Sequence, residues 1–568
     1  MSPSPTGRLR LRARPSLDAA RAIGPRIEVA GLALLAYVPF LLSSRGRVSA
    51  DTKAYLYLDP GRLLERAVSM WDPHIGAGTV PHQQIGYLFP MGPFFWVIEQ
   101  LGVPDWVAQR LWLGSISFAA LLGARWLLRL LGAGRLGALA GALVYGLTPY
   151  QLAFTASLSV LLLPWAGLPW LVGLTLRALR RGGWRDPALL ALVVLATGGV
   201  NASALVLAVL GPALLVVIEL ARQPVRRRVI LLAAARIGLL SLGVSLWWIV
   251  GLRLQGAHGL PVLELTESLA IVADASSPDE VLRGLGNWLL DGEDAVGPVI
   301  EQAGGYREGG WVGAASYAIP VAALAAAAFL RWRHRAYAVM LVVVGAVVAV
   351  GSWPYEDRTP WGSAWKAFTG TSFGLALRNS PRVIPVLTLG LAALLAAAVS
   401  AQPSRRRQVV GAVLVGGLAF ATLGPAWRTG FLASRLDRPE EVPAYWQEAI
   451  AAMDAGGDET RVLELPGANF AAYRWGNAVD PITPGLTDRP YLAREVLPYG
   501  TPASVNLLDA LDGRIQQGVF EPASLAPVAR LFGVGTVALR SDVDTARFGL
   551  HPTEKLWDTV TRPLAPGL

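Results

Sequence analysis

An aspartate follows closely on the first long apolar stretch of the chain. Asp51 stands a few residues beyond Leu42, where that stretch ends, and therefore lies near the depth of lipid headgroups. A carboxylate in this place can act as the general base that removes the proton of an attacking sugar hydroxyl. Aspartate is also favoured at the first position of a helix, so Asp51 could simply cap the segment after it. The residues alone leave both interpretations open.

A second carboxylate could return to the same place. Glu267, in LPVLELTESLA, comes shortly after the seventh apolar stretch, in a loop (253–314) that is rich in acidic residues. Two carboxylates can bracket a sugar as base and positioning group, or hold a divalent cation between them. The alternative is that Glu267 is one more solvated acid of this loop.

Two arginines stand at the head of a later apolar stretch. Arg378, Asn379 and Arg382 occur in LRNSPR, and arginine binds phosphate oxygens strongly in a bidentate manner. A lipid phosphate is therefore a natural ligand, although any interfacial arginine can also extend toward the headgroups. Lys53, one of only three lysines, could help to neutralise the same phosphate or could pair with Asp51.

Several classes of site are disfavoured. The chain has no cysteine, which excludes disulfides and thiolate chemistry, and His74, His82 and His258 lack the close spacing of zinc ligands. Aromatic residues such as Tyr87 are more typical of an interfacial belt than of a sugar platform. No glycine-rich phosphate loop is present, which favours a lipid-phosphate donor over a nucleotide sugar.

Composition indicates a polytopic membrane protein. Of 568 residues, 53% are hydrophobic and 16% charged, and the mean hydropathy is +0.44. The net charge of +10 reflects arginines between apolar stretches and does not indicate a nucleic-acid partner. We expect eleven spans: Val29–Leu42, Leu111–Leu131, Leu136–Leu147, Val160–Leu176, Ala188–Val200, Ala202–Leu220, Ile230–Leu252, Ala315–Leu330, Ala336–Val350, Val383–Val399 and Val409–Leu423.

The arginines predict the orientation in the membrane. Lys and Arg, 23 in all, gather in six segments on one side of the predicted spans: the N-terminal tail, 125–135, 177–185, 222–228, 331–335 and 405–407. The positive-inside rule places these segments in the cytoplasm. The N-terminus is then cytoplasmic, and the other loops, with Asp51, Glu267 and Arg378, are extracytoplasmic. RLRLRAR near the N-terminus is expected to be a cytoplasmic anchor and not part of a signal peptide.

The chain divides near residue 426. Residues 1–425 form the predicted transmembrane domain, whereas in 426–568 the apolar runs shorten to strand length, as in 461–467 and 533–542. Amphipathic stretches at 442–453 and 526–534 lie between them. Such alternation predicts a small soluble α/β domain on the extracytoplasmic side.

These segments carry a resemblance to a known family. SADTKAYLYLDPGRLLERAVSMWDP, HQQIGYLFPMGPFFW and VPDWVAQRLWLGS resemble the N-terminal core of the arabinofuranosyltransferase D family of actinobacterial cell-wall enzymes. LTESLA, LRNSPR and, in the tail, FAAYRWGNAVDPITPGL and VARLFGVGTVALRSDVD continue the similarity in order. Family members commonly continue into long carbohydrate-binding modules, whereas this sequence stops at Leu568. It is expected to be either a short member or a truncated piece.

The resemblance implies a GT-C membrane glycosyltransferase. Such an enzyme would transfer arabinofuranose from decaprenyl-phosphate-arabinose to arabinan of arabinogalactan or lipoarabinomannan, through α-(1→3) links. Carried over by motif, Asp51 would be the catalytic base and Glu267 the second catalytic acid, with Arg378, Asn379, Lys53 and Arg382 at the donor phosphate. We expect inversion in a single displacement. Further substrate-binding candidates are Asp59, Trp71, Asp72, His82 and Tyr87.

Other functions remain in view. No cofactor is required for this chemistry, and a divalent cation is the only candidate. A transporter would need charges buried along a path at mid-bilayer, and the predicted spans have almost none. A non-catalytic scaffold that binds cell-wall glycan, or a transferase that uses another sugar or acceptor, remains an alternative.

Overall fold

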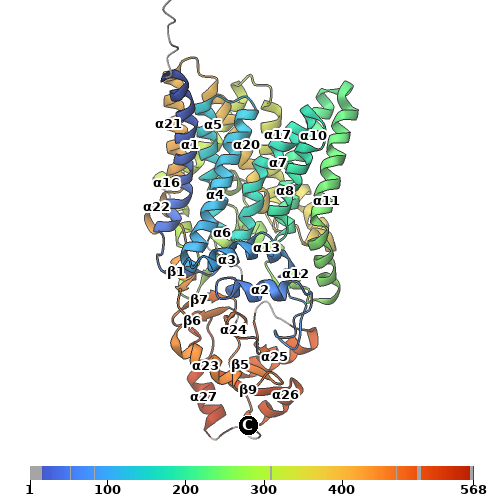
Figure 1. Cartoon of the computed structure of the whole chain (residues 1–568), viewed down its shortest axis with the longest axis vertical. Helices are drawn as coiled ribbons and strands as arrows, with labels where there is room; N and C mark the ends of the chain where they lie inside the picture. Colours follow the sequence, from blue (N-terminus) through green and yellow to red (C-terminus); the bar gives the residue numbers. More distant parts are fainter. Residues whose placement is uncertain are drawn as a thin grey trace, which may run out of the picture.

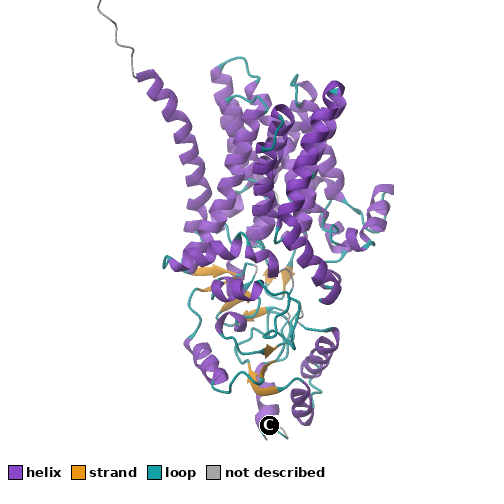
Figure 2. Ribbon diagram, turned by 45° about the vertical axis from the view of Figure 1, so that its right-hand side comes forward, coloured by secondary structure: helices purple, strands orange, loops and turns teal. Residues whose placement is uncertain are grey.

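A bundle of long helices carries a smaller α/β unit at one end (Figure 1). The computed structural model describes residues 16–562 except 52, 82–83, 156, 308–309, 469 and 496–499, together with 564 and 567. The bundle fills one half of the elongated molecule, and the strands lie almost entirely in the other (Figure 2). The first helix starts at the bundle end that is far from the C-terminus.

All eleven predicted apolar segments are helical. Seven helical segments of the described residues are long and apolar enough to cross a membrane. The chain is therefore a multi-pass membrane protein, while the number of eleven spans stays a prediction. The helices are α1 (Ser16–Leu42), α4 (Asp105–Leu130), α5 (Arg135–Gly146), α7 (Leu162–Arg181), α8 (Arg185–Gly198), α9 (Ala202–Ala208), α10 (Leu210–Arg222), α11 (Arg227–His258), α16 (Gly310–Phe329), α17 (Arg335–Val350), α20 (Ile384–Ser400) and α21 (Arg405–Thr422).

Helices α7 and α20 form the centre of the bundle. In their most apolar windows 94% and 89% of the residues are buried, against 17% in α11 at the periphery. Small residues allow this close packing. A Cβ atom added to Gly137 of α5 would lie 2.2 Å from the carbonyl oxygen of Ala396 in α20, and one added to Gly141 would lie 2.7 Å from that of Ala392.

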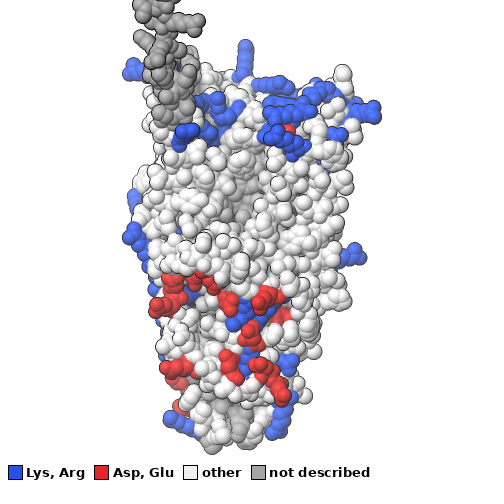
Figure 3. All heavy atoms as spheres, in the orientation of Figure 1, with Lys and Arg blue, Asp and Glu red and all other residues white. Residues whose placement is uncertain are grey.

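Charge divides the two ends of the molecule. Lysine and arginine gather at the end where α1 begins, whereas aspartate and glutamate gather at the other end of the bundle and over the α/β unit (Figure 3). This separation is the one that the loop composition predicts.

Short elements fill the layer between the bundle and the α/β unit. From the first loop come β1 (Arg47–Ser49), η1 (Ala54–Leu56), α2 (Pro60–Ala67), η2 (Gln84–Leu88) and α3 (Met91–Gln100). From later loops come α6 (Tyr150–Thr155), η3 (Ser159–Leu161), α12 (Val262–Leu265), α13 (Leu269–Ala275) and η7 (Ser380–Val383). Strand β1 pairs antiparallel with β4 (Asp437–Pro439), so the first loop is joined to the start of the C-terminal part.

The C-terminal part is built on a three-stranded parallel sheet of order β8-β5-β9. The runs predicted as strands contain β5 (Arg461–Leu465) and β9 (Val534–Leu539), and β8 is Tyr491–Leu492. The predicted amphipathic stretches overlap α23 (Ala444–Asp454) and α26 (Leu525–Leu531) to within one residue.

The two parts share contacts in both directions. Leu432 and Leu436, beyond the predicted boundary, pack in the main core of the bundle. Ala54 and Ile75 of the first loop pack instead in a cluster with Trp446 of the α/β unit. The boundary at 426 stays a prediction, and the layer around it belongs to both parts.

Candidate functional site

Asp51 is buried beneath the first loop. The residue is only 2% exposed. Its carboxylate accepts hydrogen bonds from the backbone N–H of Ser159, at 2.8 Å, and from the hydroxyl of Tyr57, at 3.3 Å. It does not cap the helix that follows, because Lys53 holds the capping position of η1. Burial raises the pKa of Asp51 to about 6, although the bonds from Ser159 and Tyr57 oppose this. A carboxylate with this pKa is suited to accept a proton near neutral pH.

Helix α4 fixes the loop that carries Asp51. The amide of Gln109 exchanges two hydrogen bonds of 2.9 Å with the backbone of Ser49. The guanidinium of Arg110, which is fully buried, donates to the carbonyl oxygens of Ser44 and Arg47. These polar contacts turn an irregular loop into a rigid support.

Lys53 pairs with a carboxylate from the C-terminal part. Its Nζ lies 3.4 Å from Oδ2 of Asp480. Burial alone would lower the pKa of Lys53, but the attraction of Asp480 prevails and the pKa is raised, so the lysine stays charged. Sequence reasoning did not single out Asp480. Its one signal is an Asp-Pro step, Asp480-Pro481, like those at Asp59 and Asp72.

Glu267 sits in a pocket of cationic and amide groups. Its Oε1 accepts from Nδ2 of Asn379 at 3.1 Å and lies 3.5 Å from an Nη of Arg382. Its Oε2 is 4.0 Å from Arg378. Only 11% of the Glu267 side chain is exposed, which is too little for a solvated loop acid. The structure thus brings together four residues that the sequence analysis selected from two distant loops.

The two arginines of this cluster are used differently. Arg378 donates to the carbonyl oxygens of Glu267 and Leu375 and to the hydroxyl of Thr266. Arg382 contacts Glu267 and the hydroxyl of Ser203, while its Nε is buried and has no partner among the described residues. Arg378, 4% exposed, therefore holds a loop and does not extend to the headgroups.

The segment from α6 to η3 contacts Asp51 near one end and interacts with Arg382 at the other. Ser159 donates to Asp51 at its end, and Tyr150 lies at its start. Burial raises the pKa of Tyr150, and the charge of Arg382 opposes that shift, which places the phenol near the arginine. Asp51 and Arg382 thus flank one short segment of chain.

The remaining candidates separate into two groups. Tyr87 is buried and close enough to Lys53 to influence its charge. Asp72 is buried, accepts from the N–H of His74 and leaves its Oδ2 without a partner among the described residues. Asp59 caps α2 and pairs with Arg62, a structural role. Trp71 is half exposed over Gly78, and His82 lies outside the described residues.

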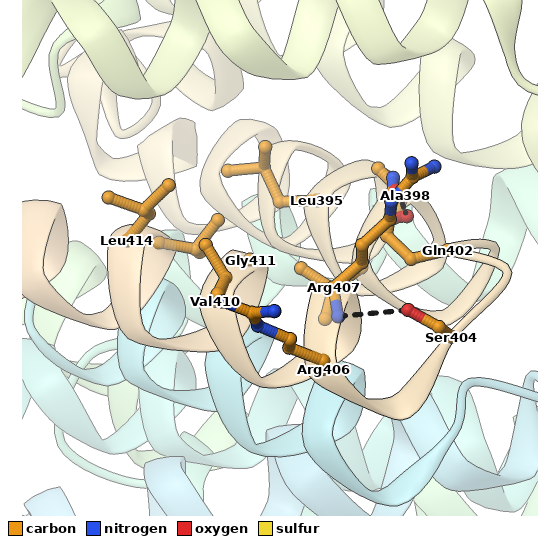
Figure 4. Close-up of a pocket in the computed structure, with 11 residues that line it drawn as sticks. Leu395, Ala398, Gln402, Ser404, Arg406, Arg407, Val410, Gly411 and Leu414 are labelled. Atoms are coloured by element: carbon orange, nitrogen blue, oxygen red, sulfur yellow. Dashed lines mark hydrogen bonds between the residues drawn. The ribbon is translucent and has the colours of Figure 1, made fainter.

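We also searched the described residues for metal ligands and for cavities near the predicted site. The described residues hold no group of three or more Asp, Glu or His side chains that could bind a metal ion. A cavity of about 660 Å³ lies between α20 and α21 at the arginine-rich end, lined by residues such as Gln402 and Arg407 (Figure 4). A second, of about 530 Å³, borders α13. None of the predicted site residues lines either cavity.

Comparison with known proteins agrees with the earlier resemblance. The Mycolicibacterium smegmatis α-(1→3)-arabinofuranosyltransferase is 30% identical over 527 residues, which are 88% of this chain and 36% of that protein. The Mycobacterium tuberculosis enzyme of the same name is 31% identical, over 88% of this chain and 37% of its own length. The chain thus spans little more than a third of these relatives.

Solved structures share the fold. The cryo-EM structure of arabinofuranosyltransferase AftD from mycobacteria aligns with a TM-score of 0.75 at 26% identity, over 94% of this chain and 37% of that one. A mutant form aligns with a TM-score of 0.70. The model of the family described as alpha-(1->3)-arabinofuranosyltransferase, N-terminal GT-C domain, matches residues 35–565. The fold class predicted from the sequence is confirmed, and the chain belongs to this GT-C family.

Proposed function

We propose that this protein is a membrane arabinofuranosyltransferase. It takes arabinofuranose from decaprenyl-phosphate-arabinose and transfers it, with inversion, to arabinan of arabinogalactan or lipoarabinomannan. The observation that carries the proposal is the buried carboxylate of Asp51, held by the backbone N–H of Ser159, in a chain of the arabinofuranosyltransferase family that also holds an arginine-containing cluster around Glu267.

Asp51 is the general base. Its raised pKa of about 6 leaves it ionised at neutral pH but basic enough to take the proton of an acceptor hydroxyl. That hydroxyl attacks the anomeric carbon of the arabinose, the bond to the phosphate oxygen breaks, and the polyprenyl phosphate leaves with the electron pair.

Arg382 meets the charge of the departing phosphate. Its Nε has no partner among the described residues, whereas Arg378 is occupied by backbone oxygens. Arg378 and Asn379 instead hold Glu267, and Glu267 orients Arg382. A preorganised donor at a developing charge is commonly worth about 3–4 kcal/mol. Lys53 and Asp480 stabilise the loop of Asp51, and Tyr87 lines it.

The reaction takes place on the extracytoplasmic face. The arginine-rich end, with the loops before α5, α8, α11 and α21, faces the cytoplasm, and the acidic end with the α/β unit faces outward. The polyprenyl tail lies among the spans, so that the sugar reaches Asp51 at the depth of the headgroups. No metal is required for this step.

The test is a transfer assay with the purified protein in lipid. Labelled decaprenyl-phosphate-arabinose and an arabinan oligosaccharide are supplied, and the linkage of the product is analysed. Asp51→Asn should lower the rate about 100- to 10,000-fold, the usual contribution of a general base.

The matched control is Asp512→Asn. Asp512 is equally buried but accepts from the N–H of Gly467 within the α/β unit. Its variant should transfer arabinose normally per folded molecule. A normal rate in Asp51→Asn would refute the base assignment, and no transfer by the unmutated protein would favour the scaffold alternative.

A further inference from the structure

One buried glutamine of the intermediate layer lacks hydrogen bonds. Gln84, at the start of η2, is 2% exposed, and neither Oε1 nor Nε2 of its amide has a partner among the described residues. Two other buried glutamines are paired: Gln109 with the backbone of Ser49, and Gln302 with the carbonyl oxygens of Gly430 and Leu432.

An unpaired amide in this position opposes folding. Burial removes the hydrogen bonds that the amide makes with water, and without a protein partner this loss is not recovered. Leucine or methionine would fill the same space without that cost. The amide therefore suits a ligand that enters the site.

The short helix η2, which begins at Gln84, lies between the two halves of the site. A Cβ atom on Gly86 would lie 2.5 Å from the carbonyl oxygen of Gly199, so η2 packs directly on the turn before α9. Ser203, in the first turn of α9, receives the hydrogen bond of Arg382. On its other side η2 carries Tyr87, which interacts with Lys53 and Tyr57 of the Asp51 loop.

The chemistry of the amide selects its ligand. Nε2 can only donate and Oε1 can only accept, so full pairing requires a ligand that both accepts and donates. A phosphate diester offers acceptors alone and would leave Oε1 unpaired. A sugar offers hydroxyl groups, each of which donates and accepts.

We infer that Gln84 binds two hydroxyl groups of the sugar that is transferred. Nε2 donates to one hydroxyl, and Oε1 accepts from the other. This inference rests on the proposed function: Arg382 takes the phosphate, Asp51 the acceptor hydroxyl, and Gln84 the sugar between them.

The first test replaces the amide by an apolar side chain. Gln84→Leu should raise the KM for the lipid-linked arabinose about tenfold, the sum of two modest hydrogen bonds. The Tm of the protein without donor should stay equal or rise, because an unpaired polar group is removed. Gln84→Met, which is unbranched, gives the same measurement if the leucine variant does not fold.

The second test varies the ligand. Donors that each lack one ring hydroxyl are compared with the full donor. Where the missing hydroxyl is one that Gln84 binds, the KM should rise for the unmutated protein but should not rise further for Gln84→Leu. A purely structural glutamine would not produce this coupling.

Gln302→Leu is the control. It breaks two hydrogen bonds of 2.9 and 3.1 Å, so it should lower the Tm and leave the donor KM unchanged. An unchanged KM in Gln84→Leu would overturn the inference, whether or not the Tm falls, since the amide would then serve the fold. If the unmutated protein transfers no arabinose, the proposed function fails instead.

Discussion

The protonation of Asp51 should govern the pH dependence of transfer. The base must be ionised, and its pKa in the folded protein is about 6. We expect kcat/KM to fall as the pH drops through about 6, and we expect this lower limb to vanish in the residual activity of Asp51→Asn. Measuring kcat/KM against pH for both proteins tests these expectations. If the fall near pH 6 persists in Asp51→Asn, another group causes it.

The same carboxylate should lower stability at neutral pH. The folded pKa of about 6 lies above the usual aspartate pKa of 3.8, so the folded state binds the proton more tightly, and stability is lost as the pH rises from about 4 through about 6. Each pKa unit corresponds to about 1.4 kcal/mol. Asp51→Asn should therefore raise the Tm at pH 7 and leave it nearly unchanged at pH 4. A Tm that falls at pH 7 would contradict this account.

The two arginines before α20 should respond differently to replacement. Arg382→Gln should lower kcat about 100-fold or more, as expected for a lost donor at a developing charge, with a small change in Tm. Arg378→Gln should lower the Tm clearly, because the carbonyl oxygens of Glu267 and Leu375 and the hydroxyl of Thr266 lose their hydrogen-bond donor. Transfer kinetics and melting curves of the two variants test this difference. An equal loss of Tm in both variants would mean that both arginines support the fold.

Residue types in loops predicted part of this site. Asp51 and Glu267 are candidates because carboxylates after apolar stretches can act on a sugar. Arg378, Asn379 and Arg382 are candidates because they form a phosphate-binding group at the head of another such stretch. Asp480 was not selected, because its partner Lys53 is more than 400 positions away and no local pattern encodes that pair. Gln84 escaped notice because a neutral amide in a loop does not reveal whether it is buried. The catalytic roles stay predictions.

At the level of elements, the pair of Lys53 and Asp480 ties the Asp51 loop to the α/β unit. Lys53→Met leaves a buried carboxylate without its cation and should cost about 3–5 kcal/mol of stability. Adding Asp480→Leu should recover much of this loss, because both charges are then gone. Unfolding of the single and double variants gives the coupling energy. Additive losses would mean that the two groups do not support each other.

Helix packing offers a second test at this level. Gly137→Ala places a methyl group 2.2 Å from the carbonyl oxygen of Ala396, so it should lower the Tm and the yield of folded protein. Gly243→Ala in α11 is the control, because nothing lies within 4 Å of its added Cβ. It should be neutral or stabilising by about 1 kcal/mol, the difference in helix propensity. Equal effects would remove the packing argument.

Long helices were predicted well because the bilayer demands long apolar runs, and each run that was selected is helical. The short elements were not. Strands β1 and β4 have three residues each and pair over a sequence distance of about 390 residues, so neither has a pattern of its own. The layer that supports the site is therefore the part of the fold that depends most on tertiary structure.

For the whole molecule, the orientation can be read with single cysteines, because the chain has none of its own. Gln402 is exposed at the arginine-rich end, and Glu521 is exposed in the α/β unit, so each can be replaced by a cysteine that a reagent can reach. In intact cells a membrane-impermeant maleimide should label Glu521→Cys alone, and after lysis both. Labelling of Gln402→Cys in intact cells would reverse the topology.

The pairing of β1 with β4 also bears on the order in which the protein is made. The first loop leaves the ribosome early, whereas its strand partner at Asp437 and the partner of Lys53 at Asp480 are synthesised only after the last long helix. Through most of translation the spans can already be inserted while the Asp51 loop still lacks its neighbours. If the proposed function holds, sugar transfer begins only after the chain has been made at least as far as Asp480, and a ribosome that stalls within the bundle leaves an inserted but inactive protein.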